Sequence, residues 1–179
     1  MSQTESQKKR KALFNRDNVP DGGTCLSSFL VVTRGNEILV GKMRNPQVWI
    51  DRFFVGEKFA PVYASSGKYV LPASHLAWYE SPQEAALRVA SEQVTYLPHS
   101  QEDIRLLAVQ SFVSGDPIST AQPPHWDICF VYEMRLQPGE DISKPEWFEE
   151  LRFVDKGKLQ VDDFTRGHGD ILQQLKLIA

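Results

Sequence analysis

Short apolar runs rich in β-branched residues recur along the chain and predict most of its strands. Two of them, residues 25–33 and 37–43, are separated only by the polar segment 34–36, which contains Gly35. A short Gly-containing segment between two such runs is typical of a β-hairpin. We therefore predict two paired strands here, after a polar lead-in at residues 1–22 that ends in a Pro- and Gly-rich turn.

Further strands are predicted in the second half of the chain. Residues 104–113 and 126–136 are long apolar runs, and shorter strands are expected at residues 68–71 and 151–155. In the run 126–136, alternate apolar residues share one face, as the two-residue period of a strand requires. These residues are Trp126, Ile128, Phe130 and Tyr132.

Two segments have the signals of helices. Ser81 can cap free backbone N–H groups, Pro82 suits the first helical position, and Glu84 completes a capping box. This helix is expected to run from residue 82 to about residue 94. A second helix is expected over roughly residues 169–178, where the apolar side chains form one stripe. The stripe consists of Ile171, Leu172, Leu175 and Ile178.

The order of elements, strands then helix then strands then helix, predicts one α/β domain over residues 23–179. Such an order suits a mixed β-sheet between helices. An aromatic-rich insert at about residues 45–66 has no clear period. Its rings can stack on a nucleobase, but covering the sheet or forming a homodimer contact is the favoured role. The rings belong to Trp49, Phe53, Phe54, Phe59 and Tyr63.

Composition and charge narrow the classes of function. Hydrophobic residues at 41% and charged residues at 24% are ordinary for a soluble globular protein. The net charge of -3 argues against wrapping a nucleic-acid backbone, though not against binding one nucleotide. There is no apolar run of about 18 residues, as a membrane-spanning helix needs. Cys25 and Cys129 lie far apart and are expected to be small buried hydrophobes, so a reducing, cytoplasmic location is the default expectation.

Charged residues at fixed spacing surround the first predicted helix. The segment at residues 74–96 resembles a degenerate Nudix box, whose pattern is G-x5-E-x7-R-E-U-x-E-E-x-G-U with U a bulky aliphatic residue. Glu80, Arg88 and Glu92 match this pattern. The resemblance extends from about residue 25 to the end of the chain and implies the α/β/α sandwich of the Nudix family. The departures from the box are Ser74, Val89, Gln93 and Thr95.

In the Nudix (MutT-like) family, box carboxylates hold Mg²⁺ or Mn²⁺, which binds a diphosphate and helps to activate water. Positions 89, 92 and 93 are related as i, i+3 and i+4, so we expect them to form one patch facing the substrate. Glu92 is the patch's charged residue, because Val89 and Gln93 stand where carboxylates are usual.

The resemblance therefore implies a metal-dependent hydrolase of a nucleoside diphosphate-linked or other diphosphate metabolite. Its activity is expected to be weak or altered, with Mg²⁺ or Mn²⁺ as cofactor if it is active. The alternative is a non-catalytic nucleotide-binding or regulatory module on the same fold.

The resemblance also implies roles for individual residues of the box. Glu92 is expected to hold the metal and to carry catalysis, with Arg88 orienting it. Arg88 and Glu80 are expected to brace the box loop by ion pairing, with Glu80 as a further metal ligand. The spacing of Glu84, Arg88 and Glu92 also fits a simple charge ladder on a solvated helix face, which stays open as an alternative.

Substrate contacts are expected from Arg44, Ser74 and His75. Arg44 follows the predicted strand 37–43, and its forked guanidinium suits phosphate oxygens. A surface Arg at a strand end is the alternative interpretation. Ser74 can donate its hydroxyl to a phosphate. Carboxylates outside the box are candidates for restoring metal binding, and they are Asp127, Glu133, Glu146, Glu149 and Glu150.

Overall fold

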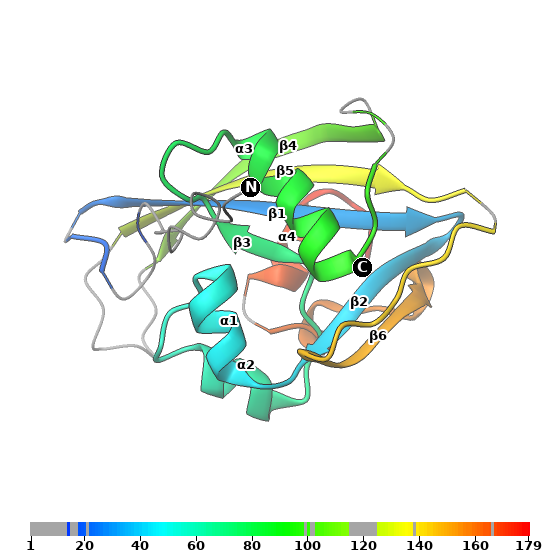
Figure 1. The fold of residues 1–179 in the computed structure, drawn as a ribbon, viewed down its shortest axis with the longest axis horizontal. Helices are drawn as coiled ribbons and strands as arrows, with labels where there is room; N and C mark the ends of the chain where they lie inside the picture. The colour runs from blue at the N-terminus through cyan, green and yellow to red at the C-terminus, as the bar shows by residue number, and fades with distance from the viewer. Residues whose placement is uncertain are drawn as a thin grey trace, which may run out of the picture.

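The computed structural model describes residues 14, 18–20, 22–98, 100, 103–114, 125–137, 139–165 and 167–179. Most of the predicted lead-in at residues 1–22, and its basic run at 8–11, lie outside these residues. The described part contains a six-stranded mixed sheet in the order β4-β5-β1-β2-β6, with β3 paired to β1 (Figure 1). The strands are β1 (Thr24–Arg34), β2 (Glu37–Met43), β3 (Ala73–His75), β4 (Ile104–Ser114), β5 (His125–Arg135) and β6 (Phe148–Asp155).

Strand β1 lies at the centre of the sheet and is a member of its parallel strand pair. It runs parallel to β5, from Thr24 opposite Trp126 to Thr33 opposite Arg135. The other pairs are antiparallel, including the predicted hairpin of β1 and β2, in which Thr33 lies opposite Ile38. The strands predicted at 104–113, 126–136 and 151–155 are confirmed in β4, β5 and β6.

Two details of the strand prediction are wrong. Residues 68–71 form no strand and contribute only isolated bridges, Gly41 with Val70 and Tyr69 with Phe164. Strand β3 was not expected, because Ala73 and Ser74 looked like part of a loop. β3 pairs with the half of β1 that carries Ser27, Ser28 and Phe29, so sheet pairing fixes the start of the box.

Helices cover both faces of the sheet. On one face, Val89 of α3 (Pro82–Val89) packs with Leu30 and Val32 of β1. On the other face, Val31 packs with Ile171 of α4 (His168–Gln174). Neighbouring residues of β1 serve different cores because successive side chains of a strand point to opposite faces. The predicted mixed sheet between helices, an α/β/α sandwich, is confirmed.

The aromatic insert folds into two short helices, α1 (Pro46–Phe53) and α2 (Ala60–Ser66). Trp49 and Phe53 are buried, and the Trp49 ring lies edge-on to Phe148 at 5.0 Å between centroids. The Trp49 indole N–H donates to the carbonyl oxygens of Arg44 and Trp147, each at 3.0 Å. For Trp49 and Phe53, the role is therefore to cover one end of the sheet.

Helix α3 begins as predicted. The Ser81 hydroxyl accepts from the Glu84 N–H at 3.2 Å, and the Glu84 carboxylate accepts from the Ser81 N–H at 2.7 Å. The helix continues as a π-helical segment, η1 (Ala90–Val94). Short 3₁₀ turns, η3 (Lys156–Lys158) and η4 (Val161–Asp163), lead from β6 to α4.

Helix α4 ends at Gln174, earlier than the predicted residue 178. Lys176 has a positive φ of 57°, a left-handed conformation that a continuing helix does not allow. Ile178 is nevertheless buried, so the apolar stripe is used beyond the helix itself. Among the described residues, no helix is long and apolar enough to span a membrane.

Candidate functional site

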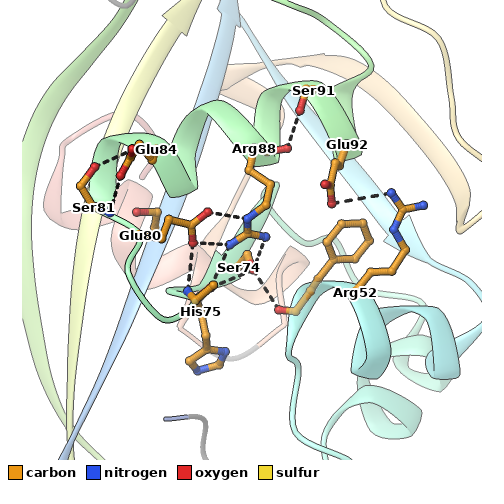
Figure 2. Close-up of polar contacts among 12 residues, drawn as sticks. Arg52, Ser74, His75, Glu80, Ser81, Glu84, Arg88, Ser91 and Glu92 are labelled. Carbon is orange, nitrogen blue, oxygen red and sulfur yellow. Dashed lines mark hydrogen bonds and ion pairs between the residues drawn. The ribbon is translucent and has the colours of Figure 1, made fainter. Parts of the chain in front are cut away.

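Arg88 and Glu80 form a two-point ion pair at the start of the box. The Arg88 side chain is only 5% exposed. Its Nε donates to Glu80 Oε1 and its Nη2 to Glu80 Oε2, both at 2.7 Å (Figure 2). Paired parallel hydrogen bonds are the strong geometry between guanidinium and carboxylate. The ion pair implied by the resemblance is present, and burial rules out a solvated charge ladder through Arg88.

The same two side chains hold the backbone of the box loop. Arg88 Nη1 donates to Ser74 Oγ at 3.1 Å, and Nη2 donates to the His75 carbonyl at 3.2 Å. Glu80 Oε2 accepts from the Ala77 N–H at 2.9 Å. These hydrogen bonds fix the positions of β3 and of the loop that joins β3 to α3.

Val89 lies in the hydrophobic core. Its exposure is 0%, and it packs with Leu30, Val32 and Met134 between α3 and the sheet. The expected patch of residues 89, 92 and 93 facing a substrate is therefore wrong. A carboxylate at position 89 would be buried among apolar side chains, where a charged group without a partner is costly.

Gln93 is also fully buried, and its amide pairs with the backbone of Ala73. Gln93 Oε1 accepts from the Ala73 N–H at 3.0 Å, and Nε2 donates to the Ala73 carbonyl at 2.7 Å. A Glu has no Nε2 donor, so it would set an oxygen against that carbonyl. At this position the amide ties the helix to β3.

Glu92 points toward α1 instead. Its Oε2 lies 3.7 Å from Arg52 Nη2, and its side chain is 17% exposed (Figure 2). The Arg52 guanidinium lies 4.7 Å from the centre of the Trp147 ring. The box carboxylate expected to hold a metal is therefore already beside a cation.

These residues do not fit a divalent cation held in the manner that the box implies. Mg²⁺ dehydrates reluctantly and is usually bound through carboxylate oxygens. Within the part of the chain that the structure describes, no three His, Cys, Asp or Glu side chains gather closely enough for a metal ion. Glu92 is opposed by Arg52, and both oxygens of Glu80 accept hydrogen bonds from Arg88 or Ala77.

The three residues that were expected to contact the substrate do not all lie together. Arg44 is exposed at the end of β2, and its backbone N–H donates to the Trp147 carbonyl at 2.8 Å. Ser74 and His75 lie together in β3 and line a cavity that Arg44 does not line. The Ser74 hydroxyl contacts the Phe53 carbonyl at 3.1 Å, so it joins the box loop to α1.

Two of the carboxylates outside the box are paired on the sheet. Glu133 lies 2.9 Å from Arg105 and 3.0 Å from Arg135. Burial raises the pKa of Glu133, but hydrogen bonds from both Arg side chains outweigh it and hold the pKa below its usual value. Glu150 pairs with Lys42 at 3.4 Å and also with Arg152.

The remaining candidates differ in their surroundings. Glu146 and Glu149 are exposed. Asp127 is 5% exposed and accepts a hydrogen bond from the Cys25 thiol. Cys25 and Cys129 are both buried, as predicted, and they form no disulfide. Asp127 lines the same cavity as Ser74 and His75.

This cavity has a volume of about 290 Å³ and lies next to the box loop. Its walls come from the sheet, the insert and the start of α4. The sheet contributes Ser27, Phe29, Asp127 and Cys129; the insert contributes Trp49, Phe53, Phe59 and Tyr63; and the last wall is formed by Gly167, His168, Asp170 and Ile171.

His168, the first residue of α4, is also part of this cavity. Its Nδ1 accepts from the Leu71 N–H at 2.9 Å, and its ring lies edge-on to Phe29 at 5.1 Å. His168 was not among the residues that the sequence predicted for the site. In the sequence it stands between Gly167 and Gly169, a pattern that indicates only the start of a helix.

Comparison with known proteins gives the fold. No protein-family model matches the sequence, and no curated protein matches it. A bifunctional NMN adenylyltransferase/ADP ribose pyrophosphatase from Francisella tularensis aligns with a TM-score of 0.59 at 14% identity, over 88% of this chain and 42% of that one. The present chain thus spans less than half of that protein.

Two smaller proteins align along most of both chains. A MutT Nudix hydrolase from Burkholderia pseudomallei has a TM-score of 0.54 at 19% identity, over 85% of this chain and 98% of that one. The Nudix domain of Shewanella oneidensis NrtR, solved with ADP ribose, has a TM-score of 0.54 at 13% identity, over 92% of each chain. With the braced box loop and the helix-covered mixed sheet, these alignments identify the fold of this chain as the Nudix fold.

Proposed function

We propose that this protein is a ligand-binding module on a Nudix fold and that it does not carry out metal-dependent hydrolysis at its box. The proposal rests on one observation, which is what the side chains at positions 89, 92 and 93 of the box helix contact. Val89 is in the core, Gln93 is bonded to the backbone of Ala73, and Glu92 lies beside Arg52. Val89 and Gln93, at two positions where the box has carboxylates, support the folded structure instead, and the Glu92 carboxylate lies 3.7 Å from the Arg52 guanidinium.

The cavity beside the box loop supports the binding part of the proposal. Binding sites for small molecules are concave, mostly apolar and fitted with a few polar groups. The cavity has this character, because aromatic walls surround Asp127, His75 and His168. It is assembled from segments far apart in the sequence, and a bound molecule would touch all of them.

A second candidate function is weak hydrolysis of a nucleotide with a divalent ion. It is favoured by the intact pair of Arg88 and Glu80 and by the Glu at position 92. The Francisella protein has also been solved with AMP and a manganese ion. This candidate needs Glu92 to leave Arg52 and to act without neighbouring carboxylates.

An assay separates the two candidates. Release of phosphate or of AMP is measured with ADP ribose, dinucleoside polyphosphates and nucleoside triphosphates, in Mg²⁺, in Mn²⁺ and in EDTA. We expect no turnover above the protein-free rate in any of them. Turnover that requires Mn²⁺ and is lost in Glu92→Gln would overturn the proposal in favour of the hydrolase.

A further inference from the structure

We propose that β4, an edge strand of the sheet, pairs with β4 of a second copy of this chain. Among the described residues, β5 is the strand that pairs with β4, so the far side of β4 carries backbone N–H and C=O groups that no described strand uses (Figure 1). Such a row of groups is a template for another strand. The surface is distinct from the aromatic insert, where the sequence allowed a homodimer contact.

The two edges of the sheet differ in charge. Proteins usually protect an exposed edge strand with charged side chains, Lys above all, or with Pro. Strand β4 contains neither Lys nor Pro, and its charged residue, Arg105, is matched within the chain by Glu133 at 2.9 Å. Strand β6, at the opposite edge, carries Glu149, Glu150, Arg152 and Asp155. The edge that lacks protection is therefore β4.

Exposed apolar side chains lie along the β4 edge. Leu106 is 48% exposed and Val109 is 54% exposed, and Trp126 of the neighbouring strand is 56% exposed. The register places Leu106 opposite Tyr132 and Val109 opposite Phe130. Because alternate residues of β5 share a face, Leu106, Val109 and Trp126 all point to one side of the sheet. A partner at this edge would meet apolar side chains as well as backbone groups.

The regular part of β4 sets the register of the proposed pair. A bulge interrupts the pairing with β5 just before Ala108, and the register is unbroken from there to Ser114. A bulge twists an edge away from a partner, so we expect the second strand along this regular stretch, antiparallel and centred on Ser111. Val109 then lies opposite residue 113 of the second copy. The stretch contains no charged residue, so the pairing brings no like charges together.

Symmetry favours a second copy of β4 as the partner strand. Pairing about a two-fold axis is self-complementary and closed, and it joins two sheets into one whose outer edges are both the charged strand β6. Pairing of β4 with β6 of another copy would leave one β4 uncovered at the end of every assembly, so copies would add without closing. The symmetric pair covers both unprotected edges.

The mass of the unmodified protein in solution is the first test. Light scattering after size-exclusion chromatography measures it at loading concentrations from micromolar to millimolar. We expect the mass to rise toward that of two chains and to stop there, as closed two-fold symmetry requires. A single-chain mass over the whole range overturns the proposal, and so does a mass that continues to rise beyond two chains.

Val109→Lys tests where the two copies meet. A Lys on an edge strand opposes pairing, because its charge would lose hydration in the interface. We expect the dissociation constant of the dimer to rise at least about tenfold. Val62→Lys, at a position of α2 that is 59% exposed, is the matched control and should dimerise as the unmodified protein does. An unchanged dissociation constant in Val109→Lys contradicts the proposal.

Ser111→Cys tests the register and decides the question if Val109→Lys does not fold. Directly opposite residues of an antiparallel pair have Cβ atoms about 4.5–5.5 Å apart, which is near the span of a disulfide. Under mild oxidation we expect Ser111→Cys to form a covalent dimer on a non-reducing gel. Ser65→Cys, at an exposed position of α2, is the control and should remain a single chain. Equal cross-linking of the two variants overturns the symmetric pairing.

Discussion

At the scale of single residues, two box positions of the helix serve the fold, and a third lies beside a cation. Val89 fills the core, Gln93 satisfies the N–H and carbonyl of Ala73, and Glu92 lies beside Arg52. A buried group left without a hydrogen bond costs about 1–3 kcal/mol, and more if it is charged. Restoring a carboxylate at position 93 would therefore work against the fold.

Gln93→Glu is expected to lower the free energy of unfolding by at least about 2 kcal/mol, because it removes the Nε2 donor and buries a charge. Urea denaturation followed by circular dichroism measures the change. Gln47→Glu, at an exposed position of α1, is the matched control and should be close to neutral. Similar stabilities for the two variants would refute this role of Gln93.

The sequence predicted the Glu80–Arg88 pair, because both residues match defined positions of the box pattern. It did not predict the burial of Val89 or the turn of Glu92 toward α1. The prediction assumed regular α-helical spacing, whereas the segment Ala90–Val94 is π-helical, with the Thr95 N–H donating to the Ala90 carbonyl.

At the scale of elements, the ends of the box helix are fixed by local hydrogen bonds. At its start, the Ser81 N–H lowers the pKa of Glu84, and the Ser81 hydroxyl adds to the effect. At its end, Thr95 takes the left-handed conformation with φ 54°, which a β-branched residue adopts at a cost. Both ends were visible in the sequence as a capping box and as a Gly-to-Thr departure.

The capping box makes the stability of α3 depend on pH. Because the folded-state pKa of Glu84 is lowered, its contribution is present above the usual value of 4.5 and is lost as pH falls through the lowered pKa. We expect Glu84→Ala to be less stable than the unmodified protein at neutral pH, with a gap that narrows in acid. Glu84→Gln keeps a side-chain oxygen that can accept from the Ser81 N–H but removes the charge. Thermal unfolding across pH that shows a constant gap for Glu84→Ala would contradict the assignment.

Thr95 offsets its strained backbone with hydrogen bonds to the loop before β6. Its hydroxyl donates to the Ser143 carbonyl at 2.8 Å and accepts from the Ser143 N–H at 3.1 Å. Thr95→Val keeps the shape and the strain but loses these bonds, so we expect a loss of about 1–2 kcal/mol. Thr95→Gly loses the bonds but relieves the strain. In chemical denaturation, Thr95→Gly should have a higher free energy of unfolding than Thr95→Val. The reverse order would show that backbone strain at position 95 is unimportant.

The helices of the insert could not be predicted from the sequence. Helices α1 and α2 have 8 and 7 residues, and neither has a side-chain cap at its start. Helices this short are marginal alone and are stabilised by packing. Trp49 and Phe53 supply that packing against Phe148, a contact between segments about a hundred residues apart that no local pattern reveals.

At the scale of the whole molecule, the order of strands and helices was enough to predict the layers, whereas the cavity was not predictable. The cavity brings together β1, β3, β5, the insert and α4, and only the folded sheet sets these beside one another. Strand β3 (Ala73–His75), at the start of the box, serves both features, since Arg88 braces it and Ser74 and His75 line the cavity. The Nudix fold thus remains, and the cavity that we propose as the ligand site lies beside the box.

The most direct test of this account is a titration of the protein with Mn²⁺ followed by electron paramagnetic resonance, which distinguishes free from bound ion. We predict no stoichiometric site at micromolar concentration, and the same curve for Glu92→Gln as for the unmodified protein. One tightly bound Mn²⁺ per chain that disappears in Glu92→Gln would contradict the claim that the box positions serve folding rather than a metal.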